Sequence, residues 1–159
     1  MAKEDDIQQE LVKQFASLEG KVRFQRPRRM WALVENAEFM KVLNFLMKKQ
    51  GFTILCTMTG LDKGDTLAVI YHLSREDGIV LNVEINTPRA NPSIKSVTRL
   101  FPSADLYERE LVDLLGIKVE GLAEGFRYPL TDDWPKDQHP LRKDWKTPAT
   151  AAPDAAKED

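Results

Sequence analysis

Three carboxylates and a guanidinium lie close together in this chain, at Glu108, Arg109, Glu110 and Asp113. Paired carboxylates can act as general acid and base, and clustered ones can bind a cation. Arg109 and Asp113 are four residues apart, so on a helix they can form an ion pair, which leaves Glu108 and Glu110 without a local partner. Three interpretations stay open at this point: a catalytic or metal site, a solvated charged face, and a set of salt bridges at an interface.

Thiol and imidazole groups are scarce. Cys56 is the single cysteine, and His72 and His139 are the only histidines. One cysteine cannot form an internal disulfide or hold an iron–sulfur cluster, which needs about four thiolates. We therefore expect a chain that carries no electrons itself, with Cys56 as a buried, unreactive thiol.

The helix that must position the charges is predicted from its apolar residues. Tyr107, Leu111, Leu114 and Leu115 recur at i, i+4, i+7 and i+8, so they share one face that can dock on a sheet. Ser103 is the expected N-cap of this helix.

The preceding residues have the pattern of an α+β domain. Helical spacing predicts amphipathic helices over about 5–18 and 36–51, the second capped by Asn36. Alternating or continuous apolar runs predict strands near 22–24, 30–34, 52–58, 66–73 and 79–85, with a short helix or turn over 94–100 and a possible edge strand at Ile117 and Val119. We predict an antiparallel or mixed sheet of about 4–5 strands, with helices packed on one face and an extended C-terminal arm.

This pattern divides the chain into three parts: a domain over residues 1–120, an arm over 121–146 and a disordered tail over 147–159. The arm is rich in proline and aromatic residues without periodicity. Such side chains must be buried somewhere, either on their own domain or on a partner. A proline-stiffened arm loses less entropy on docking, which favours a partner.

Composition excludes several classes of partner. Apolar residues make up 42% and charged residues 30% of the 159-residue chain, and the net charge is −2. A basic patch lies at Arg23, Arg26, Arg28 and Arg29, but we expect no nucleic-acid binding, because the overall charge of the chain is acidic. No apolar run reaches the ~20 residues needed to cross a bilayer, and residues 1–10 do not resemble a signal peptide. We expect a cytoplasmic protein without direct membrane insertion.

The charged helix and the arm together resemble a known family. The sequence E-R-E-x-x-D-L-L-G-I over 108–117, followed by D-D-W at 132–134 and P-L-R-K-D at 140–144, is similar to the 30 kDa subunit of respiratory complex I. This family comprises the C subunit of NADH–quinone oxidoreductase and homologues in energy-converting NiFe hydrogenases and formate hydrogenlyase. The resemblance covers roughly Leu18 to Trp145 and includes the upstream piece 59–62.

The resemblance implies an accessory subunit with no catalytic residues and no cofactor of its own. Such a subunit docks on the large catalytic subunit, which holds the quinone site or the NiFe centre, beside small subunits that carry iron–sulfur clusters. It lies on the cytoplasmic face of the cell membrane as a peripheral part of the complex. The alternatives are a stand-alone carboxylate-based hydrolase or metal-dependent enzyme, and an adaptor for an unrelated partner.

The same resemblance assigns partner docking to the motif residues. The chain departs from the family pattern at Leu122 and near Phe126, where Arg127 can replace a familial basic residue after a one-residue shift. The expected docking residues are Glu108, Arg109, Glu110, Asp113, Arg127, Asp132, Asp133, Trp134, His139, Leu141, Arg142, Lys143 and Asp144.

Overall fold

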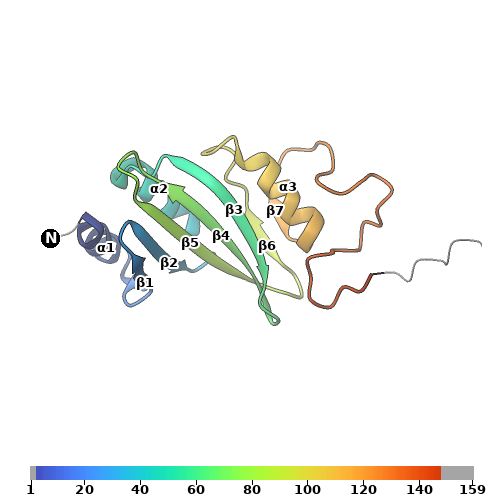
Figure 1. Cartoon of the computed structure of the whole chain (residues 1–159), viewed down its shortest axis with the longest axis horizontal. Coiled ribbons are helices and arrows are strands. Elements are labelled where there is room, and N and C mark those ends of the chain that lie inside the picture. Colours follow the sequence, from blue (N-terminus) through green and yellow to red (C-terminus); the bar gives the residue numbers. More distant parts are fainter. Residues whose placement is uncertain (1–2, 148–159) are drawn as a thin grey trace, which may run out of the picture.

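A five-stranded mixed sheet forms the centre of the computed structural model, which describes residues 3–147 (Figure 1). The strands lie in the order β1-β2-β5-β4-β3, with β2 and β5 parallel and the other neighbours antiparallel. Their bounds are β1 Val22–Arg26, β2 Arg29–Val34, β3 Ile54–Asp62, β4 Thr66–Ser74 and β5 Val80–Pro88. The predicted α+β class and the strand number are confirmed.

Three α-helices accompany the sheet: α1 Lys3–Gln14, α2 Phe39–Gln50 and α3 Ala104–Leu115, with a short 3₁₀ turn, η1, at Ala16–Leu18. The Phe39 ring of α2 lies 4.4 Å from the Tyr71 ring of β4. Tyr71 pairs with Met58 of β3, and Gly60, two residues further along the same strand, meets Leu111 and Leu115 of α3, so α2 and α3 share one face of the sheet. This agrees with the prediction of helices on one face.

The opposite face carries polar side chains that bond to one another. His72 of β4 lies between the Thr59 hydroxyl and the Asn82 amide oxygen, at 2.9 and 2.7 Å. Nearby, the Trp31 indole donates to Glu84, which also pairs with Lys63. His72 is therefore part of a local hydrogen-bond network.

Two short strands form a second, separate sheet. β6, Ser93–Lys95, pairs in parallel with β7, Lys118–Glu120. The strand predicted at Ile117 and Val119 therefore exists as β7, but it pairs with β6 and does not extend the main sheet. Of the short helix or turn predicted over 94–100, the structure has the turn, over residues 98–100. The strands β6 and β7 are far apart in sequence, and their pairing holds α3 between them.

Several local expectations also need correction. α2 begins at Phe39, and the Asn36 amide donates 2.9 Å to the Ser93 carbonyl instead of capping that helix. Ser103 occupies the N-cap position of α3 but forms no capping hydrogen bond through its side chain. Cys56 is exposed, because a bulge between Leu55 and Thr57 changes the alternation along β3.

The arm follows β7 without regular structure. Figure 1 shows it looping outward beside α3 and returning past the C-terminal end of that helix. Apart from Thr147, the predicted disordered tail lies outside the described residues. Within residues 3–147, no helix is long and apolar enough to span a bilayer.

Candidate functional site: the contact between α3 and the arm

The apolar face of α3 docks on β3 as the spacing predicted. Leu111 and Leu115 are buried, and they pack where β3 has Gly60. A Cβ at Gly60 would lie 2.6 Å from the Leu111 Cδ2 and closer still to the Leu115 Cδ1, so any larger residue would force these two side chains to shift. The Tyr107 hydroxyl donates 3.3 Å to the Cys56 carbonyl.

Glu108 lies in the core and is fully buried. One carboxylate oxygen accepts a 2.6 Å hydrogen bond from the Val97 amide, while Oε2 has no partner among the described residues. Burial raises the pKa of Glu108, against the opposing effect of the Val97 hydrogen bond. The Tyr71 hydroxyl is also buried and has no hydrogen-bond partner within residues 3–147, and its pKa is raised by burial and by Glu108. Glu108 therefore does not lie on the exposed face of α3, where the docking prediction placed it.

Arg109 connects α3 to the start of the arm. Its guanidinium pairs with Asp105, at 2.9 and 3.1 Å, so the predicted ion pair with Asp113 was wrong. It also donates to the Phe126 and Ala123 carbonyls, at 3.0 and 3.1 Å, and lies 5.1 Å from the centre of the Phe126 ring. The pKa of Arg109 is raised, chiefly by its hydrogen bonds to Asp105. The segment that departs from the family pattern is thus bound to this arginine.

Asp113 and Arg127 form the central ion pair of the contact. Their Oδ1 and Nε atoms are 2.6 Å apart, and the side chains are only 8% and 16% exposed. The other Asp113 oxygen accepts 2.9 Å from the Leu130 amide, and Arg127 also donates to the Trp134 carbonyl. His139 Nδ1 lies 2.9 Å from the Asp113 carbonyl oxygen, which accepts its hydrogen bond.

The C-terminal end of α3 is bound by the P-L-R-K-D segment. The Leu141 amide donates 3.0 Å to the Leu114 carbonyl, and Arg142 Nε donates 2.7 Å to the Leu115 carbonyl. Carbonyls at a helix end lack partners within the helix, so Arg142 satisfies one and complements the negative end of the helix dipole. Gly116 has φ of +66°, and a Cβ there would lie 2.9 Å from Arg142 Nη2. Arg142 is therefore directed to its own chain.

A second ion cluster ties the end of the arm to the tip of β3. Arg89 pairs with Asp62 and, at 2.5 Å, with Asp144. The Lys143 amide donates 2.8 Å to Asp62. These contacts, the Arg89 hydrogen bond above all, hold the pKa of Asp62 well below its usual range. Sequence analysis missed Asp62 and Arg89 as site residues, although Asp62 lies in the familial piece 59–62.

The two tryptophans of the arm fold against each other. The Trp134 and Trp145 rings are 6.0 Å apart, and both indole nitrogens donate to Gln138, at 2.9 Å to its carbonyl and 3.4 Å to its side-chain oxygen. We expected these rings to lie on a partner, but the structure half-buries them within the arm.

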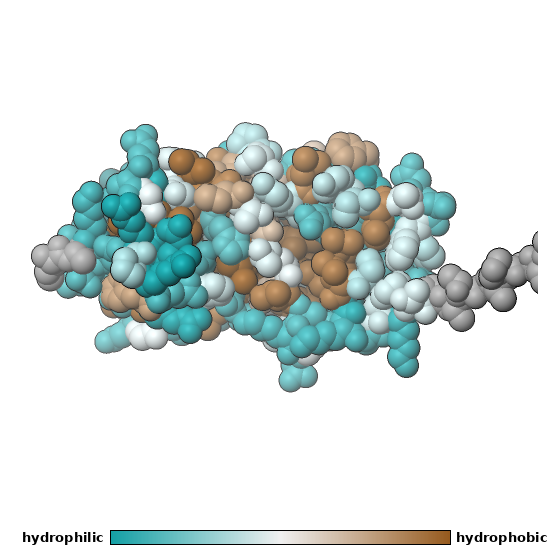
Figure 2. Space-filling model, viewed as in Figure 1, coloured by the Kyte–Doolittle hydropathy of each residue, from teal (hydrophilic) through white to brown (hydrophobic). Residues whose placement is uncertain are grey.

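Other expected docking residues remain accessible. Asp132, Asp133, Lys143 and Asp144 are exposed, and Glu110 borders a pocket of about 200 Å³ between α3 and β3 that Leu141 also lines. Leu141 itself is 54% exposed. Most of the exposed large apolar side chains of residues 3–147 lie on α3 or the arm: Leu106, Val112, Phe126, Tyr128 and Leu141, against Phe24, Ile54 and Leu61 elsewhere. In Figure 2, apolar side chains are more numerous over the middle and α3 end of the face shown than at the N-terminal end.

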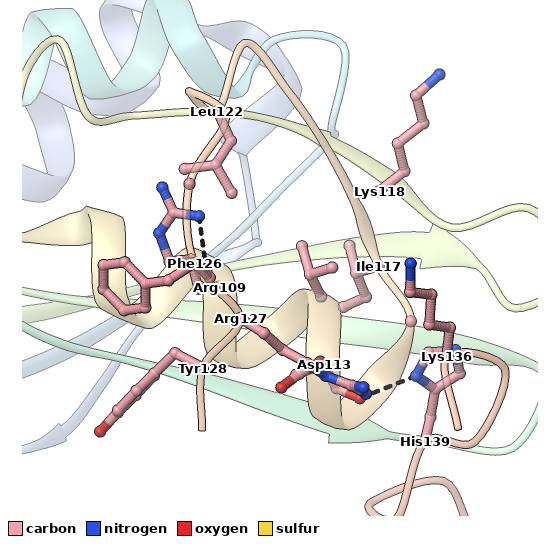
Figure 3. A pocket seen from close by; sticks show the side chains of 13 residues that line it. Arg109, Asp113, Ile117, Lys118, Leu122, Phe126, Arg127, Tyr128, Lys136 and His139 are labelled. Carbon is pink, nitrogen blue, oxygen red and sulfur yellow. Dashed lines mark hydrogen bonds and ion pairs between the residues drawn. The ribbon is translucent and has the colours of Figure 1, made fainter. Parts of the chain in front are cut away.

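A larger pocket of about 500 Å³ lies between α3 and the start of the arm (Figure 3). Val112 and Ile117 from α3 and its end, with Leu122 and Phe126 from the arm, provide apolar walls. Its charged and titratable lining residues are Arg109, Asp113, Lys118, Arg127, Lys136 and His139.

Comparison with known proteins places the chain in a family. The family model described as the 30 kDa subunit of respiratory-chain NADH dehydrogenase matches residues 32–151. The C subunit of NADH-quinone oxidoreductase from Moorella thermoacetica is 34% identical over 146 residues, covering 89% of this chain and 95% of the relative. Membrane-bound hydrogenase subunit beta of Pyrococcus furiosus is 26% identical over 122 residues, covering 74% and 70%.

A solved structure has the same fold. A chain from the membrane-bound sulfane sulfur reductase, an archaeal respiratory membrane complex, matches with a TM-score of 0.79 and 24% identity, over 90% of this chain and 85% of that one. The predicted resemblance is confirmed by the matched range and the sequence relatives. This chain belongs to the family of the 30 kDa subunit of respiratory-chain NADH dehydrogenase.

Proposed function

We propose that the chain is a non-catalytic structural subunit of a complex I-like oxidoreductase or an energy-converting NiFe hydrogenase, and that its α3–arm surface docks on the large catalytic subunit. The observation that carries this proposal is that residues of α3 and the arm have two different roles. Asp113, Arg127 and Arg142 fasten the arm to α3, while apolar side chains such as Leu141 and Phe126 stay exposed on the same surface. A rigid surface with exposed apolar residues suits a permanent partner.

The directions of the carboxylates argue against a stand-alone enzyme. Glu108 bonds to Val97 in the core, Asp113 pairs with Arg127, and Glu110 borders a different pocket. Acid–base or metal chemistry needs such groups to converge on one substrate position. Here they point to three separate places.

We further propose that the cofactors belong to partner subunits. Cys56 alone cannot supply the thiolates of an iron–sulfur cluster. Clusters and the NiFe or quinone site would then lie on the large and small neighbours, with this chain held at the cytoplasmic face of the membrane through them. The relatives include subunits of both quinone reductases and hydrogenases, so either parent complex is compatible.

Copurification tests this proposal. An affinity-tagged chain, purified from its own cells under mild detergent, should bring down a large catalytic subunit in equal amount. Leu141→Asp should lower that yield about tenfold or more, because it places a charge in the apolar docking surface. Phe24→Asp is the matched control, since Phe24 is a similarly exposed apolar residue on β1, and it should leave the yield unchanged. A chain that purifies alone, or an equal loss in both variants, contradicts the proposal.

A further inference from the structure

The 500 Å³ pocket combines apolar walls with positive charge. Val112, Ile117, Leu122 and Phe126 form the apolar lining, and Val112 and Phe126 are 39% and 62% exposed. Leu122 and Phe126 project from the arm toward α3 on the side of the pocket opposite Ile117 (Figure 3). The pocket therefore offers a place for an apolar side chain.

Two of the lining cations are neutralised within the fold and two are not. Arg109 pairs with Asp105, and Arg127 pairs with Asp113. Lys118 of β7 and Lys136 of the arm form no ion pair with any residue in the range 3–147. Both residues line the pocket, and in Figure 3 the Lys118 side chain extends outward from the other lining side chains. The outer edge of the pocket therefore carries uncompensated positive charge.

The walls of the pocket are held in place before anything binds. Arg109 fixes the arm through the Phe126 and Ala123 carbonyls, and the Asp113–Arg127 pair fixes the following residues. A preformed site loses little conformational entropy on binding, which favours a specific occupant.

We propose that this pocket receives an apolar side chain from a segment of a partner subunit, with carboxylates flanking that side chain to face Lys118 and Lys136. The proposal rests on the function proposed above and specifies the chemistry of the contact. Charge complementarity selects this occupant, because positive charge around an apolar cavity suits an acidic–apolar peptide segment and repels a basic one.

Crosslinking within the assembled complex tests the occupant. The photoreactive residue p-benzoylphenylalanine replaces Leu122, and the crosslinked peptides are identified by mass spectrometry after purification of the whole complex. The expected product joins Leu122 to a partner peptide in which an apolar residue is flanked by Asp or Glu. Crosslinks only within the chain, to a peptide without carboxylates, or to a small molecule overturn the proposal.

Charge reversal gives an independent measurement on the same complex. Lys118→Glu with Lys136→Glu should reduce retention of the partner about tenfold in low salt, and the difference should shrink as salt rises. The control is Lys41→Glu with Lys95→Glu, which makes the same charge change at exposed lysines outside the pocket and should alter retention less than about twofold. Replacing the crosslinked acidic residues by lysine should restore retention to the pocket variant.

Failure of this inference is distinguishable from failure of the proposed function. If the crosslinker variant purifies with its complex but gives none of the expected product, the pocket assignment is wrong and the assembly role stands. If the pocket and control variants retain the partner equally, the pocket assignment is likewise wrong and the assembly role stands. If the unmodified chain brings down no catalytic subunit, both proposals are wrong.

Discussion

Removing Arg127 tests whether the arm is part of the fold. Arg127 donates to the Asp113 carboxylate, which has one further hydrogen bond, from the Leu130 amide. Arg127→Met keeps most of the side-chain volume and removes the guanidinium. The Asp113 side chain, only 8% exposed, is then a buried charge with a single remaining donor.

The size of the effect follows from that geometry. Removing one partner of a buried ion pair costs about 3–5 kcal/mol. The retained Leu130 bond and the 16% exposure of Arg127 reduce this to about 2–3 kcal/mol. In a chain of this length, each kcal/mol of lost stability lowers the melting temperature by about 2–4 °C, so we expect a decrease of about 4–12 °C.

Urea unfolding of the isolated chain measures the loss in the free energy of unfolding. Hydrogen exchange at the Leu130 amide shows whether the arm detaches before the rest of the chain unfolds. Arg99→Met is the control, because Arg99 is exposed, and it should change stability by less than about 0.5 kcal/mol. Asp113→Asn combined with Arg127→Met should cost less than the sum of the two single changes, because the unpaired charge disappears. If Arg127→Met behaves like the control, the arm does not contribute to the fold as argued.

Three further substitutions test other contacts. Glu108→Gln should stabilise the chain at pH 7 by about 1 kcal/mol. Burial raises the Glu108 pKa in the folded chain, so the stability that Glu108 contributes is fully present below its ordinary pKa of 4.5 and is lost as the pH rises through its pKa in the folded state. Urea midpoints from pH 4 to 8 should therefore fall more steeply for the parent chain than for the variant, and parallel curves contradict this. Gly60→Ala should cost about 1–3 kcal/mol in thermal unfolding, because its Cβ overlaps the Leu115 side chain; an unchanged melting temperature would mean that α3 can shift freely. Arg142→Ala leaves the Leu115 carbonyl without its donor, so about 1–2 kcal/mol should be lost and the Leu141 amide should exchange faster, whereas unaltered exchange would show that the helix end needs no cap from the arm.

Local patterns in the sequence were enough to predict the sheet and the docking face of α3. The alternation along β5 has the two-residue period of a strand, and Tyr107, Leu111 and Leu115 have the spacing of one helix face. Tertiary packing does not change the secondary structure that these periods predict. Cys56 shows the limit of that reasoning. A bulge shifts the register of β3 by one residue, and a single slip exchanges the two faces of a strand.

The roles of the site charges were not predictable from spacing. Asp113 has a cation four residues before it, yet its partner Arg127 lies 14 residues after it, because the arm returns along α3. The charged residues around Glu108 predict a surface position for it, but it is buried and accepts a hydrogen bond from the Val97 amide. Asp62 ends β3 and Arg89 follows β5, and only the fold brings these two strand ends together. The resemblance pointed to Asp113, Arg127 and Arg142 but not to Arg89, and only the tertiary structure showed which partner each of them has.

We propose above all that this chain assembles a catalytic complex without taking part in its chemistry. The most direct test compares cells that produce the parent chain with cells that produce the Leu141→Asp variant. Two quantities are measured in each: the amount of assembled complex and the turnover per assembled complex. The account predicts that the amount falls about tenfold or more while turnover per remaining complex stays the same. An unchanged amount of complex with lowered turnover would contradict it.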